Sequence, residues 1–336
     1  MTSRSTKTIS IALCTYNGER YLQEQLDSIA AQTVLPDELV VCDDLSSDST
    51  KEILQQFAVQ ANFPVKLHFN PKNLGFVKNF EKAISLCTGD IIFLSDQDDV
   101  WRADKIEVME KYFSDPTIGM VFSNAETIDA TGNPLGRTLW EAAFFTSTLQ
   151  KQFRNGDAYK ALYLKPIVSG CTMAFERHLW SWISPLPPDI PFIHDAWIAF
   201  MTSLYSNVIL IDQPLINYRI HSEQSAAVDR HEVSASENIA KAKSGAKYQQ
   251  YRRHLQQLHL IRHRLQQYET HISTDKLSYL KQRMAEHEIH LISRTNIGPN
   301  VLIRCLNVIR ELSSGRYHRF SNGFKSAIGD LIQPNY

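Results

Sequence analysis

The N-terminal third of the chain alternates short apolar, β-branched runs with helical patterns, and this alternation limits the possible folds more than any other feature. The apolar runs have the length of buried strands and lie at residues 9–14, 38–42, 65–69 and 91–94. Helical patterns follow the first three runs, at residues 20–31, from residue 49 onward, and at residues 75–87. Three strand–helix units in succession imply right-handed crossovers and a mostly parallel sheet buried on both faces. The sequence therefore predicts an α/β fold.

The charge of the chain changes sign along its length. Residues 1–236 hold 19 Lys and Arg against 29 Asp and Glu, a net charge of −10. Residues 237–336 hold 16 against 7, a net charge of +9, together with seven of the twelve histidines. Such asymmetry indicates two regions with different electrostatic roles. We predict an α/β domain at residues 1–230 and a basic helical region at residues 231–336.

Neither a membrane span nor a disulfide framework is expected. No window approaches the ~18 uninterrupted apolar residues of a spanning helix, and the run at residues 9–14 is shorter than a typical signal-peptide core of ~7–15 residues. The cysteines, at positions 14, 42, 87, 171 and 305, are odd in number and never paired as Cys-x-x-Cys, which argues against a zinc site. We therefore expect a cytoplasmic protein.

Polar residues follow three of the predicted strands, where ligands bind in open α/β sheets. They are Thr15-Tyr16-Asn17-Gly18, Asp43-Asp44 and Ser95-Asp96-Gln97-Asp98-Asp99. Loops and helix caps also favour Asp and Ser, but three carboxylates within four residues repel one another unless a cation or protons neutralise them. Such oxygen ligands suit Mg²⁺ or Mn²⁺. Because the sequence contains no Gly-rich phosphate loop, we expect a diphosphate to bind through the metal.

The order and spacing of four motifs resemble those of family 2 glycosyltransferases. The motifs are Thr15-Tyr16-Asn17-Gly18, Asp43-Asp44-Leu45-Ser46-Ser47-Asp48-Ser49-Thr50, Asn73-Leu74-Gly75 and Ser95-Asp96-Gln97-Asp98-Asp99-Val100-Trp101. The resemblance covers roughly residues 8–225 and implies the GT-A fold, a Rossmann-like α/β fold that binds nucleotide sugars, here with a C-terminal helical extension. One departure is Leu45, where the family usually has a Gly, often in a tight turn.

The resemblance also implies roles for the residues at the strand ends. Thr15, Tyr16 and Asn17 would line the nucleotide site. Asp43 would accept a hydrogen bond from the imide N–H of a pyrimidine, and Asp96 would contact the ribose or the metal shell.

The expected cofactor is Mn²⁺ or Mg²⁺, which would stabilise the charge on the leaving diphosphate. By resemblance, Asp98 ligates this cation, and Asp99 is either a second ligand or the cap of a helix predicted at residues 101–113. His221 completes the metal shell in the same reading, with a solvated loop residue as the alternative. Arg219 would pair with the diphosphate or form a structural salt bridge.

An inverting transfer also needs a base for the acceptor hydroxyl. The candidate is Asp195 in His194-Asp195-Ala196-Trp197, which is close to the base motif of the family; the alternative is an N-cap for a helix at residues 196–205. The small residues Gly170, Cys171 and Thr172 fall in a predicted strand at residues 169–175. They would let an acceptor approach closely, or would simply form a core strand that bends at Gly170.

The C-terminal region, residues 238–332, reads as helical. Two apolar stripes suggest an antiparallel helical hairpin, with a self-associating coiled coil as the alternative, and a further helix restarts at Gly298-Pro299. Its last part places apolar residues at 4-4-3 spacing near basic ones: Phe320, Phe324, Ile328 and Leu331 with Arg304, Arg310, Arg316, Arg319 and Lys325. This pattern suits an anionic membrane surface or a lid on the acidic domain. No nucleic-acid-binding module is recognisable.

These features together predict an inverting, metal-dependent glycosyltransferase of bacterial surface polysaccharide synthesis. The motif around Asp98 resembles rhamnosyltransferase-like members, so dTDP-L-rhamnose is the first donor expected and a UDP-hexose the second. The acceptor would be a saccharide, lipid-linked or free, and a lipid-linked one would bring the protein to the inner face of the plasma membrane. The alternatives are an inactive nucleotide-binding scaffold, which the intact Asp43, Asp98 and Asp195 disfavour, and a nucleotidyltransferase, which would want a basic phosphate-gripping loop.

Overall fold

The structure is a computed structural model that describes residues 7–163, 165–187, 194–222, 224, 246–296 and 300–331. The chain divides into two compact units, residues 1–188 with 192–229, and residues 189–191 with 230–336. The domain boundary predicted near residue 230 lies outside the described residues. Each unit is considered by itself below.

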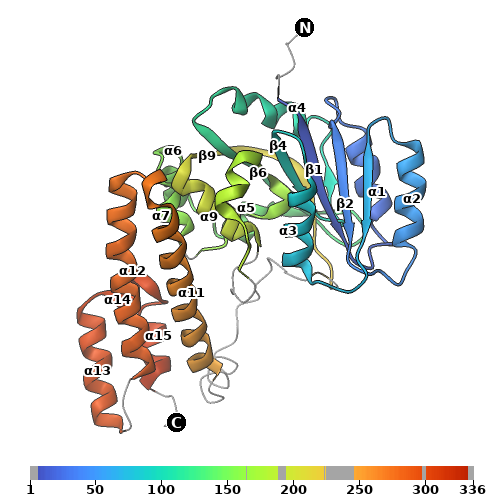
Figure 1. The fold of residues 1–336 in the computed structure, drawn as a ribbon. Coiled ribbons are helices and arrows are strands. Elements are labelled where there is room, and N and C mark those ends of the chain that lie inside the picture. Colours follow the sequence, from blue (N-terminus) through green and yellow to red (C-terminus); the bar gives the residue numbers. More distant parts are fainter. Residues whose placement is uncertain are drawn as a thin grey trace. The chain divides into compact units, whose positions relative to one another are not determined.

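The strands of the N-terminal unit form one mixed sheet (Figure 1). Among the described residues its order is β3-β2-β1-β4-β8-β6-β9-β5, with β7 paired to β6. Four neighbours are parallel and correspond to the four predicted strands: β1 (Ile9–Thr15), β2 (Glu38–Asp43), β3 (Val65–Phe69) and β4 (Ile91–Ser95). The prediction of an α/β fold is therefore confirmed.

Helices cover both faces of this parallel part. Helices α1 (Leu22–Ala30) and α2 (Thr50–Gln60) share one core cluster with β1. Its members here are Leu22, Leu26 and Ile29 of α1, Leu54 and Phe57 of α2, and Ile9, Ile11 and Leu13 of β1. Helix α3 (Phe76–Leu86) contacts β1 and β2 but does not belong to that cluster, so it packs on the opposite face. Because both faces are covered, β1, β2 and β4 are buried along their whole length.

The second half of the sheet contains both parallel and antiparallel strand pairs. Strand β8 (Met173–Glu176) is antiparallel to both β4 and β6 (Ile118–Ile128), and β9 (Asn207–Arg219) runs parallel to β6. The short β5 (Val100–Trp101) and β7 (Pro134–Thr138) add antiparallel edges. After β7, five helices lie within the described ranges of this unit: α5 (Leu139–Ala142), α6 (Ser147–Arg154), α7 (Ala158–Leu162), α8 (Trp180–Ile183) and α9 (His194–Tyr205).

One predicted helix is shorter than expected. The sequence predicts a helix at residues 101–113, but Val100 and Trp101 pair with Asn217 and Ile216 as β5. The helix α4 (Lys105–Glu110) starts later and continues as a 3₁₀ turn, Lys111–Ser114. Val100 and Trp101 form a strand instead of a helix because pairing with β9 supplies backbone hydrogen bonds. The local helical pattern of the sequence does not reveal this pairing.

The first two described helices of the C-terminal unit form the predicted helical hairpin (Figure 1). Helices α11 (Ala246–Tyr268) and α12 (Thr274–Thr295) lie side by side, joined through a 3₁₀ turn, Glu269–His271. The hairpin buries Leu258 and Leu265 from one predicted stripe and Leu280 and Met284 from the other. These four side chains are therefore packed within the chain, as the hairpin interpretation expects.

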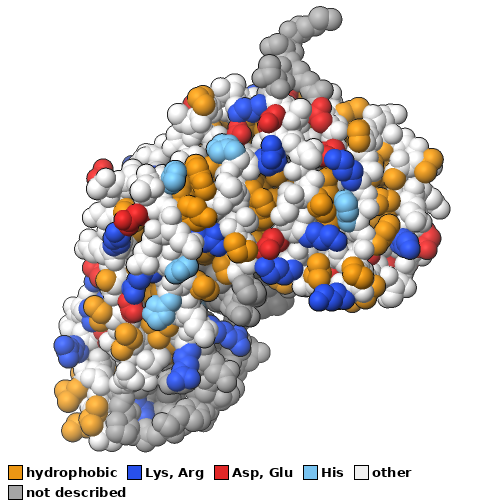
Figure 2. All heavy atoms as spheres, viewed as in Figure 1, with side chains coloured by type: hydrophobic (Ala, Val, Ile, Leu, Met, Phe, Trp, Pro, Cys, Tyr) orange, Lys and Arg blue, Asp and Glu red, His pale blue; other side chains and the backbone are white. Residues whose placement is uncertain are grey.

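Three shorter helices follow among the described residues: α13 (Val301–Ser313), α14 (Arg316–Phe320) and α15 (Phe324–Leu331). The predicted restart at Pro299 lies outside the described residues, and α13 starts with Asn300 as its N-cap. Figure 2 shows hydrophobic side chains exposed over α13, at the lower left of the view. Within the described ranges, no helix is both long and apolar enough to cross a bilayer.

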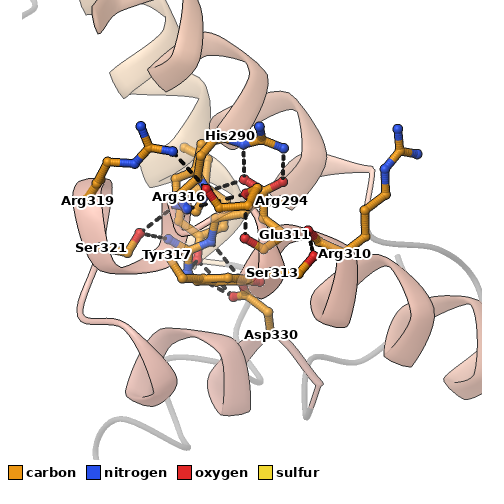
Figure 3. A network of polar contacts seen from close by, with 12 residues as sticks. His290, Arg294, Arg310, Glu311, Ser313, Arg316, Tyr317, Arg319, Ser321 and Asp330 are labelled. Carbon is orange, nitrogen blue, oxygen red and sulfur yellow. Dashed lines mark hydrogen bonds and ion pairs between the residues drawn. The ribbon is translucent and has the colours of Figure 1, made fainter.

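A buried polar network holds these helices together (Figure 3). The Asp330 carboxylate on α15 is fully buried; its Oδ2 accepts hydrogen bonds from Nε of Arg294 (2.6 Å) and from the hydroxyl of Tyr317 (2.8 Å). On α12, Nδ1 of His290 lies 2.7 Å from Oε1 of Glu311 on α13. Since each buried charge has an opposite charge or a hydroxyl beside it, the network ties α12 to the three short helices.

Candidate active site

The carboxyl ends of β1 and β2 place the predicted base-recognition residues in contact. Thr15 is paired with Asp43 in the ladder, and its hydroxyl donates a 2.9 Å hydrogen bond to Oδ1 of Asp43. The backbone N–H of Ser46 donates to Oδ2 of Asp43 at 3.0 Å, and the Ser46 hydroxyl donates to Oδ1 at 2.5 Å. The Asp43 carboxyl group is thus buried and held in one direction, as an acceptor for a ligand N–H requires.

Two loops above these strands carry exposed side chains. Tyr16 and Leu45 are 51% and 50% exposed. Gln97 fixes Tyr16, because its Oε1 accepts from the Tyr16 N–H (2.8 Å) and its amide donates to the Tyr16 carbonyl (3.0 Å). Asn17 and Leu45 have positive φ angles of 47° and 68°. Leu45 therefore has a left-handed backbone conformation, which glycine adopts more easily than a residue with a side chain.

The acidic segment after β4 gathers around Asp99. The side chain of Asp99 is fully buried; its Oδ1 accepts from the backbone N–H of Arg219 (3.1 Å), and its Oδ2 has no hydrogen-bond partner among the described residues. One ligand atom each of Asp96, Asp99 and Cys171 lies within 4.8 Å of the others. Asp99 directly precedes β5 rather than α4, so the helix-cap interpretation of this residue is wrong.

Crowding shifts the titration of these carboxyls. The pKa of Asp96 lies well above its ordinary value because of burial first, and then because of the charges of Asp98, Asp99 and Asp195. Burial and Asp98 likewise raise the pKa of Asp99. A nearby cation would therefore stabilise the charged form of these carboxyl groups, as expected from their spacing in the sequence. Asp195 is one of the charges that raise the pKa of Asp96, so its carboxyl group lies near that of Asp96.

The predicted metal ligands Asp98 and His221 lie together. Nε2 of His221 is 2.9 Å from Oδ2 of Asp98, and the His221 side chain is only 7% exposed. Its ring packs against Tyr21, with 4.8 Å between ring centroids. The alternative of a solvated loop histidine is therefore wrong.

Arg219 has a structural role in this structure. It is 2% exposed, its Nη2 forms a 2.5 Å ion pair with Glu24, and its Nε donates to the carbonyl of Asp98 at 2.8 Å. The guanidinium also lies over the ring of Tyr21, 4.7 Å from the centroid. Of the two interpretations of Arg219, the structure shows the salt bridge with Glu24, and the pairing with diphosphate stays a prediction.

Sequence reasoning missed Lys105, the cation beside the acidic segment. Lys105 is fully buried; its Nζ donates a 2.6 Å hydrogen bond to the carbonyl of Cys171 and lies 3.6 Å from the centroid of the Trp101 ring. Burial lowers its pKa to about 7, although Asp99 and Asp96 oppose the shift. The only signal in the sequence was a lysine one helical turn after Trp101, which is too common a spacing to single it out.

Asp195 lies in the first turn of α9, which starts at His194, so the simple N-cap interpretation is wrong. Its Oδ2 accepts from the N–H of Gly170 (3.0 Å) and its Oδ1 accepts from the N–H of Ala196 (2.6 Å). Burial raises the pKa of Asp195 to about 6. An aspartate with this pKa can take a proton near neutral pH.

The predicted acceptor residues reach Asp195, but not as a strand. Gly170, Cys171 and Thr172 form a buried 3₁₀ turn, and the strand β8 starts only at Met173. The prediction of a strand at residues 169–175 was therefore wrong for its first half. The turn places the N–H of Gly170 against Asp195 and the carbonyl of Cys171 against Lys105.

Comparison with known proteins identifies the family. The sequence model described as glycosyl transferase family 2 matches residues 10–180, just over half of the chain. The chain belongs to glycosyl transferase family 2. Its motifs at Thr15, Asp43 and Asp98 all lie inside the matched range, which confirms the resemblance seen in the sequence.

This glycosyltransferase has curated relatives of moderate similarity. It is 26% identical over 242 residues to an uncharacterized glycosyltransferase of Nostoc sp., an alignment that covers 70% of this chain and 71% of the relative. It is 40% identical over 101 residues to the dTDP-rhamnosyl transferase RfbG of Shigella flexneri, which covers 28% of this chain and 34% of the relative.

Solved structures support the same fold. The glycosyltransferase matches S. aureus TarS 1–349, crystallised with UDP-GlcNAc, with a TM-score of 0.55 at 17% identity over 97% of this chain and 89% of that chain. A structure of a longer TarS chain matches with a TM-score of 0.50 at 18% identity. The match covers 63% of this chain and 37% of that chain. At this identity the likeness shows the GT-A fold, followed here by C-terminal helices.

Proposed function

We propose that this glycosyltransferase moves a sugar, with inversion, from a nucleoside-diphosphate donor to a saccharide acceptor in bacterial surface polysaccharide synthesis. The observation that supports it best is the position of Asp43 and of the segment of Asp98 at the carboxyl ends of β2 and β4, the two strands that flank β1, in a family 2 fold. Asp43 binds the pyrimidine, with Thr15, Tyr16 and Asn17 around it. Retention of Asp43, Asp98 and Asp195 also argues against an inactive nucleotide-binding scaffold.

The donor site fits a divalent cation. Asp98 and His221 would hold it, since their Oδ2 and Nε2 atoms already face one another at 2.9 Å, and the unpartnered Oδ2 of Asp99 lies in the same acidic segment. When bound, such a cation neutralises charge on the departing diphosphate. An imidazole ligand favours Mn²⁺ over Mg²⁺, because Mg²⁺ prefers oxygen ligands and retains its water.

The transfer step follows from the position of Asp195. Its carboxylate takes the proton from an acceptor hydroxyl while the hydroxyl oxygen attacks the anomeric carbon, and the bond between that carbon and the diphosphate breaks. A pKa of about 6 leaves Asp195 mostly ionised at neutral pH yet basic enough to accept the proton. Gly170, Cys171 and Thr172 would line the acceptor side, because they adjoin Asp195.

The donor is proposed to be dTDP-L-rhamnose, with a UDP-hexose as the second candidate. Support comes from the motif around Asp98 and from the similarity to a dTDP-rhamnosyl transferase over 101 residues. Thermal-shift titrations with UDP, dTDP, GDP and CDP, with and without Mn²⁺, test this directly. We expect dTDP with Mn²⁺ to give the largest increase in the melting temperature of the protein.

The same titration on two variants tests whether the nucleotide and Mn²⁺ bind at the proposed site. Asp98→Ala should lose the Mn²⁺-dependent part of the shift, whereas Asp27→Ala, which removes an exposed carboxylate on α1, should retain it. Absence of any shift with all four nucleotides would overturn the proposed donor class.

We further propose that the acceptor is lipid-linked and that the C-terminal unit docks on an anionic membrane. The basic residues contribute less than the sequence suggested, because Arg304 is buried and Arg316 and Arg319 are paired with Glu311 and Glu286. The structure instead exposes apolar side chains on α13 and α15: Val301, Leu302, Leu306, Ile309, Phe324 and Ile328. Burial of this apolar surface would therefore dominate docking, and high salt should release the protein only in part.

Co-sedimentation with vesicles of phosphatidylglycerol and phosphatidylcholine tests the docking proposal. The double change Leu306→Glu and Ile309→Glu should move the protein to the supernatant. The control Val59→Glu, which alters an 88% exposed apolar residue of α2, should not. Equal sedimentation of both variants would reject docking through α13 and favour the lid interpretation of the C-terminal unit.

A further inference from the structure

Lys105 is a buried cation that the proposed transfer step does not use. It is the first residue of α4, and its side chain is fully buried. Its Nζ donates a 2.6 Å hydrogen bond to the carbonyl of Cys171 and lies 3.6 Å from the centroid of the Trp101 ring. Burial of an ammonium group costs free energy that an apolar side chain in the same place would not cost. A lysine at this position therefore calls for a role of its contact with Cys171.

The turn that Lys105 contacts is also the turn that contacts the proposed base. Cys171 belongs to the buried 3₁₀ turn Gly170–Thr172, which packs against β4, β6 and α9. One residue before Cys171, the N–H of Gly170 donates a 3.0 Å hydrogen bond to Oδ2 of Asp195. The turn therefore connects Lys105 on α4 with Asp195 on α9.

The hydrogen bond from Gly170 affects both the direction and the proton affinity of Asp195. A backbone N–H that donates to a carboxylate favours its charged form. Burial raises the pKa of Asp195 to about 6, and the N–H groups of Ala196 and Gly170 oppose that rise. Asp96 is a further charged group near Asp195. A turn that moved away from Asp195 would remove one of the opposing bonds, so the pKa of Asp195 would rise further.

We propose that Lys105 positions the base Asp195 by holding the turn Gly170–Thr172 in place. Lys105 holds this turn at the Cys171 carbonyl. The turn in its place directs the carboxylate of the base through the Gly170 N–H. The inference rests on the proposed function, in which Asp195 takes the proton from the acceptor. Lys105 is thus a positioning residue, and it acts on the rate because transfer requires the base in the correct geometry.

A second role of Lys105 would be that of a counter-charge to the acidic segment. Its charge opposes the rise that burial and Asp98 cause in the pKa of Asp96 and Asp99. Two substitutions separate the hydrogen bond from the charge. Lys105→Met removes both, whereas Lys105→Gln removes the charge and retains an N–H donor on a slightly shorter side chain.

The test measures kcat and kcat/KM for the acceptor between pH 5 and 9, with dTDP-L-rhamnose, or the donor found by the nucleotide titration, and octyl glycosides as acceptors. We expect Lys105→Met to lower kcat about tenfold or more and to move the inflection of Asp195 upward by about half a pH unit or more. Lys105→Gln should show smaller changes of both kinds. Affinity for the nucleoside diphosphate with Mn²⁺ should not fall in either variant.

Leu54→Ala controls for a general loss of stability in the same unit. Leu54 is 1% exposed on α2, so its truncation leaves a cavity and should lower the melting temperature, while the inflection stays at the wild-type pH. If Lys105→Met does not fold, Lys105→Gln still tests the proposal, because its smaller upward shift is also expected.

Three results would overturn the positioning role of Lys105. They are a wild-type inflection in every folded Lys105 variant, an equal shift in Lys105→Met and Lys105→Gln, which would assign the effect to the charge, and a shift of the same size in Leu54→Ala. If the wild type itself transfers no sugar or shows no inflection, the proposed function with Asp195 as the base fails, and this inference fails with it.

Discussion

Nε2 of His221 lies 2.9 Å from Oδ2 of Asp98, although 123 positions separate the two residues in the sequence. The contact depends on β9, which runs antiparallel to β5 and pairs Asn217 with Val100. The end of β9 is thereby brought to the acidic segment after β4. A carboxylate and an imidazole from two distant strands form the cation site proposed here.

Removal of His221 should weaken binding of the cation together with the nucleotide. We expect His221→Ala to lower Mn²⁺-dependent affinity for the nucleoside diphosphate by about 10–100-fold, the scale of losses around metal sites. Isothermal titration calorimetry with and without Mn²⁺ measures the effect. His178→Ala is the matched control, because that side chain is 64% exposed. Wild-type Mn²⁺ dependence in His221→Ala would remove this residue from the site.

The pH dependence of sugar transfer should follow the titration of the Asp195 carboxyl group. Burial raises its pKa to about 6, so the carboxyl is protonated below that pH and cannot act as a base. With saturating donor, kcat/KM for the acceptor should therefore rise with pH and level off above about 7. Initial rates between pH 5 and 8 test this. A profile without any inflection in that range would indicate that another group takes the proton.

Leu45 should carry backbone strain that glycine relieves. A left-handed φ costs a side-chain-bearing residue about 1–2 kcal/mol, and glycine costs roughly 0.5–1 kcal/mol in chain entropy, so Leu45→Gly should stabilise by about 0.5 kcal/mol. Leu45→Ala keeps the Cβ and should show no gain. Urea unfolding of both variants measures the difference. Equal stability of Leu45→Gly and Leu45→Ala would mean that the turn is not strained.

The C-terminal unit should depend on the buried pair of Asp330 and Arg294. Asp330→Asn leaves the 7% exposed side chain of Arg294 without its carboxylate and should cost about 3–5 kcal/mol. Adding Arg294→Met to Asp330→Asn should restore part of the loss, because the uncompensated charge is then gone. Thermal scans of helical circular dichroism test both. Additive losses in the double variant would contradict the pairing.

The parallel half of the sheet was predictable because its signals are local. Residues 9–14 and 38–42 are continuous apolar runs, and a parallel strand buried on both faces must have that composition. The polar residues after each run then identify the ligand edge, and Thr15 meets Asp43 there as the register requires. The acidic segment around Asp98 was visible for the same reason.

What sequence reasoning missed depends on contacts between distant residues. Arg219 read as a candidate for diphosphate because nothing in the sequence reveals Glu24, its ion-pair partner 195 positions away. The helix at residues 101–113 was overextended because the pairing of Val100 with β9 has no local signal. Lys105 likewise becomes apparent only when its surroundings are known.

The central claim, sugar transfer with Asp195 as the base, is tested most directly by Asp195→Asn. The amide keeps the shape and cannot take a proton, so donor binding with Mn²⁺ should be unchanged while acceptor-dependent transfer falls by roughly two to four decades. Asp212→Asn, on the exposed side of β9, should transfer at the wild-type rate. Single-turnover transfer from the bound donor measures all three proteins. A rate for Asp195→Asn within a few-fold of wild type would contradict the assignment of the base.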